Sequence, residues 1–141
     1  MLTEKTSYVH TLPLRVYYED TDAGGVVFYA NYLKFFERAR TEWLRELKVH
    51  QSTLSQQMQL LFMVKKVEIE YIKPAALDYL LDIRSQITSI GGASIHFHQE
   101  AWHQDQQLCK SKVIVVCVDA KTMQATRIPS SLRSILENTQ D

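Results

Sequence analysis

Four extended stretches follow one another after residue 60, with only short turns between them. They cover residues 60–75, 78–90, 93–103 and 106–120, and a proline ends the first while a glycine pair ends the second. Parallel neighbours would need a crossover helix between each pair of strands, and the pattern shows none. The sequence therefore predicts a mostly antiparallel sheet, with 106–120 as a central strand because its β-branched run is continuous.

One helical stretch and one further strand precede this sheet. Apolar residues recur at spacings of three and four over residues 31–48, which predicts a long helix with a wide, buried aromatic face. Residues 13–20 indicate a first strand that Gly24-Gly25 ends, and a short helix is expected from Ser130. One long central helix wrapped by a curled, mostly antiparallel five-stranded sheet is the α+β arrangement called the hotdog fold. Free sheet edges are commonly paired with another subunit, so we expect a dimer at least.

The size and charge of the chain exclude several classes of protein. Its 141 residues fit a single domain over 1–141, and 16 basic residues balance 16 acidic ones. A zero net charge argues against a nucleic-acid partner, and neither a secretory signal nor an apolar run long enough for membrane insertion is present. Cys109 and Cys117 lie roughly 26 Å apart along one predicted strand, too far to bridge. We therefore expect core thiols and a cytoplasmic protein.

The segment "YYEDTDAGGVVFYANY" (residues 17–32) concentrates the residues that could carry chemistry. Glu19, Asp20 and Asp22 stand within four residues, and a glycine pair and the helix entry follow. A helix entry offers unpaired backbone N–H groups that can polarise a carbonyl oxygen. A carboxylate opposite such donors is the minimum arrangement for acyl transfer.

Two interpretations of this segment stay open on the residues alone. Asp-Thr-Asp followed by Gly-Gly is also good turn chemistry, in which aspartate side chains accept hydrogen bonds from nearby backbone N–H groups. Of the three carboxylates, Asp22 is our catalytic candidate, with Glu19 and Asp20 expected to be structural or exposed.

Other polar residues give weaker indications. His96, His98 and Glu100 share one strand face, which could form a metal site but more often is a polar sheet surface, so we predict no metal. The other histidines stand alone and are expected at the surface: His10, His50 and His103. On the helix, Arg40 falls near the apolar face and is expected to be a buried or interface partner for an acid.

The run "VYYEDTDAGGVVFYANYLKFFERARTEWL" resembles the signature of the 4-hydroxybenzoyl-CoA thioesterase family of hotdog proteins. More narrowly, it is similar to the Tol-Pal-system-associated acyl-CoA thioesterases of Gram-negative bacteria (the YbgC type). The likeness continues through "VEIEYIKPAALDYLLDI" and "VIVVCVDAKTMQATRIP" and so covers nearly the whole chain. It implies hydrolysis of acyl-CoA to CoA and a free acid, without a cofactor, in a homodimer or homotetramer.

The resemblance also implies roles for single residues. Asp22 matches the family's catalytic aspartate, proposed as nucleophile or general base, and Gly25 matches the glycine at the bend into the helix. Tyr29 matches the position whose backbone N–H polarises the thioester carbonyl, and Tyr18 matches an active-site tyrosine. Many members carry histidine where this chain has Tyr29. The backbone donor survives that replacement, whereas a tyrosine is a poor base at neutral pH.

The nucleotide of CoA would need groups that bind phosphate. We predict Lys65, together with the turn that holds Gly92 and Ser94, whose N–H groups could bind an anion. A hydratase is disfavoured because the key segment contains no histidine. The remaining alternative is a non-catalytic module of the cell envelope that binds acyl-CoA or acyl carrier protein.

Overall fold

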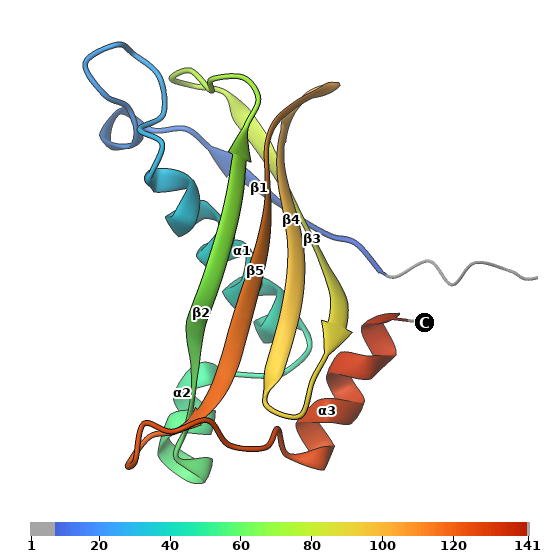
Figure 1. Cartoon of the computed structure of the whole chain (residues 1–141). Coiled ribbons are helices and arrows are strands. Elements are labelled where there is room, and N and C mark those ends of the chain that lie inside the picture. Colours follow the sequence, from blue (N-terminus) through green and yellow to red (C-terminus); the bar gives the residue numbers. More distant parts are fainter. Residues whose placement is uncertain (1–7, 141) are drawn as a thin grey trace, which may run out of the picture.

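The computed structural model describes residues 8–140 and contains one five-stranded sheet in the order β1-β3-β4-β5-β2 (Figure 1). The strands are β1 (His10–Arg15), β2 (Leu60–Tyr71), β3 (Leu80–Ile90), β4 (Ser94–His103) and β5 (Gln106–Asp119). All four neighbouring pairs are antiparallel, and β5 lies inside the sheet between β4 and β2. The predicted α+β fold is therefore confirmed, and β1 and β2 form its two open edges.

The helices confirm the predicted order of elements. They are α1 (Asn31–Glu46), the short α2 (Gln51–Thr53) and α3 (Ser130–Glu137), with further turns at η1 (Tyr18–Asp20), η2 (Leu54–Met58) and η3 (Asn138–Gln140). In Figure 1, α1 lies against one face of the sheet and α3 lies at the end where β3 meets β4. The long helix is thus placed where a curved sheet can cover its aromatic face.

The core forms where α1 meets the sheet. Its buried apolar residues follow the predicted helical spacing: Tyr32, Phe35, Phe36, Ala39, Trp43 and Leu44. Two apolar clusters result, one around β1 and the first half of α1, the other around the second half of α1 and α3. Burial of such side chains contributes about 1.5–3 kcal/mol each before the entropy cost of folding is subtracted.

The prediction of a first strand over residues 13–20 is wrong in its bounds, since β1 ends at Arg15. The backbone N–H of Tyr17 donates to Asp20 Oδ2 at 2.8 Å, and the N–H of Asp20 donates to Tyr17 O at 3.0 Å. These local bonds close a 3₁₀ turn, and a strand cannot form them. Turn chemistry of the acidic segment therefore overrides the strand pattern at this point.

The prediction that His10 lies at the surface is also wrong. Its side chain is 3% exposed, stacks on Trp43 with ring centroids 5.7 Å apart, and approaches Glu46 Oε2 at 3.1 Å. The cause is register, because the start of β1 lies beside the end of α1 and turns this residue inward. His50 is exposed as predicted, whereas His103 is half-buried and stacks on Tyr79.

Two further observations bear on the predicted environment. Cys109 and Cys117 are free and buried in β5, and burial raises the pKa of Cys109 to about 12. Within residues 8–140, no helix is long and apolar enough to cross a bilayer.

Candidate active site

A small hairpin between η1 and α1 positions Asp22. Its backbone N–H donates to Val26 O at 2.8 Å, and its carbonyl accepts the N–H of Gly25 at 3.0 Å. Thr21 and Val27 form the next bridge of the hairpin. Gly25 has a φ of +80°, a conformation that glycine adopts without the strain that a side chain would cause. The glycine at this bend is therefore required by the backbone.

The carboxylate of Asp22 is exposed, and its Oδ1 accepts the N–H of Gly24 at 2.8 Å. This bond is the turn chemistry considered above, so the turn is present. Within residues 8–140, Asp22 Oδ2 has no hydrogen-bond partner. The turn holds the carboxylate through Oδ1, and Oδ2 remains available to a substrate or a water molecule.

The helix entry supplies two backbone donors. The first three helical N–H groups already have acceptors: Asn31 donates to Phe28 O (2.8 Å), Tyr32 to Tyr29 O (3.4 Å) and Leu33 to Ala30 O (3.2 Å). By contrast, the N–H groups of Tyr29 and Ala30 have no acceptor in the part of the chain that the structure describes. The position predicted as the oxyanion donor is thus one of two successive free donors at the positive end of α1.

Asp20 ties the hairpin to this helix entry. Its carbonyl accepts the N–H of Phe28 at 3.0 Å and the side-chain amide of Asn31 at 2.8 Å. The carboxylate at Asp22 and the donors at Tyr29 therefore belong to one hydrogen-bonded unit. Asp20 is structural, as expected, and Tyr18 lies exposed on the adjoining turn, where its carbonyl accepts the hydroxyl of Thr21 at 2.8 Å.

An aromatic hollow of about 280 Å³ adjoins Tyr29. Tyr71 lines it, and its hydroxyl donates to Tyr29 O at 3.1 Å. Burial raises the pKa of Tyr71, with Cys109 and Tyr29 nearby adding to the effect. The sequence interpretation missed Tyr71, because nothing in the spacing of β2 shows that its end meets the helix entry.

The predicted phosphate-binding residues lie outside the hairpin that holds Asp22. Lys65 lies at a bulge between Val64 and Lys66 of the edge strand β2. Gly92 and Ser94 lie at the far end of β3, which at roughly 3.3 Å per residue is about 33 Å long. The Gly92 carbonyl accepts the N–H of Ile128 at 2.9 Å. Gly92 and Ser94 therefore lie far along the sheet from the start of β3, where the hairpin of Asp22 is bridged to Ala76 through Val26.

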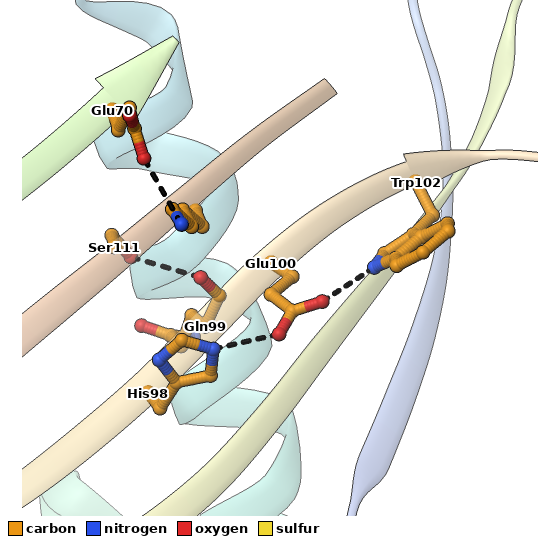
Figure 2. Close-up of polar contacts among 7 residues, drawn as sticks. Glu70, His98, Gln99, Glu100, Trp102 and Ser111 are labelled. Carbon is orange, nitrogen blue, oxygen red and sulfur yellow. Dashed lines mark hydrogen bonds and ion pairs between the residues drawn. The ribbon is translucent and has the colours of Figure 1, made fainter. Parts of the chain in front are cut away.

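The histidine pattern on β4 forms a polar network on the outer sheet face (Figure 2). His98 Nε2 lies 2.6 Å from Glu100 Oε2, and Trp102 Nε1 donates to Glu100 Oε1 at 2.7 Å. Both oxygens of this carboxylate are therefore engaged by protein groups. Across residues 8–140, no group of three or more potential ligands is arranged to hold a metal ion.

Comparison with known proteins places the chain in a family. A model described as the thioesterase-like superfamily matches residues 16–136, and the chain belongs to this superfamily. It is 46% identical over 124 residues to the acyl-CoA thioesterase YbgC of Haemophilus influenzae, covering 88% of this chain and 91% of that protein. It is also 46% identical over 121 residues to the acyl-CoA thioester hydrolase YbgC of Escherichia coli O6:H1, covering 85% of this chain and 90% of that protein.

A solved structure supports the same assignment. The probable thioesterase from Bartonella henselae superposes with a TM-score of 0.82 at 35% identity, covering 86% of this chain and 99% of that chain. The fold is therefore the hotdog fold of thioesterases, as predicted.

Proposed function

We propose that the protein is a single-domain acyl-CoA thioesterase that uses Asp22 and the backbone N–H of Tyr29. The observation that carries the proposal is the hydrogen-bonded unit that joins a partly free carboxylate to two free N–H groups. Membership of a thioesterase superfamily, and 46% identity to proteins named acyl-CoA thioesterases, support the reaction class.

The reaction follows from the chemistry of these groups. The thioester carbonyl accepts hydrogen bonds from the helix entry, which stabilise the negative charge that develops on its oxygen. Asp22 either attacks the carbonyl carbon or takes a proton from an attacking water molecule. The C–S bond then breaks and the sulfur takes up a proton, which releases CoA and a carboxylic acid. Direct attack by Asp22 adds one step, the hydrolysis of the acyl-enzyme anhydride by water.

The remaining assignments extend this proposal. Gly25 allows the close approach of the thioester, Tyr18 flanks it, and Lys65, Gly92 and Ser94 serve the nucleotide from a second subunit. Buried free thiols suit a cytoplasmic enzyme, and two open sheet edges suit a homodimer or homotetramer. An association with the Tol-Pal system rests on resemblance.

The experiment is CoA release, followed with a thiol reagent, over short, long and aromatic acyl-CoAs. Asp22→Asn should lower turnover by about 100-fold or more while the far-UV spectrum and melting temperature stay close to wild type. Glu19→Gln is the matched control, because this neighbouring carboxylate is exposed. Wild-type turnover in Asp22→Asn would refute the assignment of Asp22.

The second candidate function is a module that binds acyl-CoA or acyl carrier protein without cleaving the thioester. It is favoured by Tyr29, which stands where many relatives of this branch carry histidine. Binding of an acyl-CoA, measured by calorimetry, without release of CoA from any thioester would establish it in place of the enzyme.

A further inference from the structure

A groove of about 310 Å³ runs between α1 and the sheet, separate from the hairpin that holds Asp22. Its sheet side is apolar and is formed by β2, β4 and β5: Phe62, Val64, Val67, Ile95, Phe97, Val113 and Val115. On the helix side it begins at Leu33, one turn after the helix entry, and continues past Arg40. The groove therefore starts beside the candidate oxyanion donors and follows the helix away from them.

Arg40 places a positive charge in this groove. The residue is 8% exposed, its Nη1 donates to Gln99 Oε1 at 2.9 Å, and its guanidinium lies 5.9 Å from the ring centre of Phe97. Within residues 8–140, no carboxylate oxygen lies within 4.0 Å of its nitrogens. The expected acid partner is thus replaced by an amide. Burial lowers the pKa of Arg40 to about 10, so the side chain stays charged at neutral pH.

A buried network fixes the direction of this guanidinium. Gln99 Nε2 donates to Phe36 O at 3.0 Å and to Ser85 Oγ at 2.8 Å, which obliges Gln99 Oε1 to face Arg40. Ser111 Oγ donates to Gln99 O at 3.3 Å and holds the same residue from β5 (Figure 2). Gln99 occupies one N–H of the guanidinium. Within residues 8–140 no other hydrogen bond of the guanidinium occurs, and Arg40 lines the groove.

The burial and charge of Arg40 favour an anionic ligand. Glu37 acts on the Arg40 guanidinium through space but forms no ion pair with it within 4.0 Å, and an incoming carboxylate can form two parallel hydrogen bonds with a guanidinium. Three charged residues line the groove: Lys34, Glu37 and Arg40. Their sum is one positive charge, so the groove complements a single negative group at the end of an apolar chain.

We propose that this groove binds an acyl group with a carboxylate at its far end, and that Arg40 recognises that carboxylate. The inference rests on the proposed function, because it makes ω-carboxyacyl-CoA a preferred substrate class. Eleven residues separate Tyr29 from Arg40, which at 1.5 Å per residue is roughly 16 Å along α1. Preference should therefore rise with chain length until the carboxylate reaches the guanidinium.

The test compares pairs of acyl-CoAs of equal chain length, one ending in a methyl group and the other in a carboxylate. For wild type, kcat/KM should favour the carboxylate by about tenfold at the best length, since hydrogen bonds to charged groups are strong. Arg40→Met should abolish this preference, measured as the ratio of kcat/KM within each pair of substrates. Arg40→Lys keeps the charge but loses the paired donors of the guanidinium, so it should keep part of the preference for the carboxylate. Glu37→Gln should increase it.

Binding to Asp22→Asn, measured by calorimetry with the same pairs, separates the two proposals, because it does not require turnover. Tighter binding of the carboxylate-ended ligands that disappears on adding Arg40→Met supports the inference even if no thioester is cleaved. Equal affinities and equal rates for both members of every pair would overturn it. A loss of self-association in Arg40→Met without any ligand preference would also overturn it, by assigning the charge to a second copy.

Discussion

At the scale of single residues, substitutions of two glycines distinguish the cost of backbone strain from the cost of a steric clash. A Cβ on either Gly25 or Gly92 would meet no atom within 4 Å, but Gly25 alone of these two has a positive φ, +80°. Gly25→Ala should therefore lower the free energy of unfolding by about 1–2 kcal/mol through the left-handed backbone. It should also slow CoA release, since the residue shapes the hairpin of Asp22. Gly92→Ala is the control, and equal melting temperatures for both variants would contradict the argument.

Tyr29 would contribute to the proposed site through its backbone rather than its side chain. The structure offers the N–H of this residue to a substrate, whereas its side chain packs against Phe28 and Tyr71 and is 62% exposed. A backbone donor is common to every residue type except proline. The proposed stabilisation of the oxyanion therefore does not depend on which side chain the position carries.

At the scale of elements, alternate side chains of β4 point to opposite faces of the sheet. Gln99 points into the core, while Glu100 accepts hydrogen bonds from Trp102 and His98 on the outer face. Burial opposes ionisation of Glu100, but these hydrogen bonds and the charge of Arg84 outweigh it and hold the pKa below its usual value. The carboxylate should therefore stabilise the folded protein when it is ionised.

The pH dependence of Glu100→Gln tests this network. A folded pKa below the unfolded value gives stability that is present above about pH 4.3 and is lost as the pH falls through the folded pKa. Glu100→Gln should cost about 1 kcal/mol at pH 7 in urea unfolding, and little at pH 3. The control is Glu70→Gln on the same face, which breaks an exposed ion pair with Lys110 and should change little at either pH. A cost independent of pH would refute the electrostatic explanation.

The same scale shows what could be predicted from sequence. The positions of α1 and the four later strands follow from periodicity and turn residues, which are local properties, although β2 ends at Tyr71 and not at residue 75. The prediction of the first strand failed because the Asp20 carboxylate accepts a hydrogen bond from the N–H of Tyr17. Hydrophobic periodicity carries no information on such a side-chain bond. The burial of His10 and the pairing of Arg40 with Gln99 depend on residues 36 and 59 positions away along the chain. Tyr71 was missed at the site for the same reason.

At the scale of the whole molecule, the β2 edge and the groove suggest how two copies associate. Val64 on β2 is 48% exposed, Met63 and Leu33 are each 44% exposed, and Leu33 and Val64 line the groove. An open strand edge bordered by exposed apolar side chains is a surface that pairing between copies would cover. We expect the β2 edges of two chains to lie together, which also closes the groove along α1.

Light scattering after size-exclusion chromatography tests this arrangement. The wild-type mass should be at least twice that of one 16.4 kDa chain. Val64→Asp should shift it toward the monomer, because a charge at the centre of an apolar contact is costly to bury. Met123→Asp is the control, since this apolar residue is 52% exposed but lies in the turn after β5, beyond the start of β2 rather than along its edge. Dissociation in the control alone would place the contact between copies elsewhere on the surface. A monomeric wild type would refute the assembly.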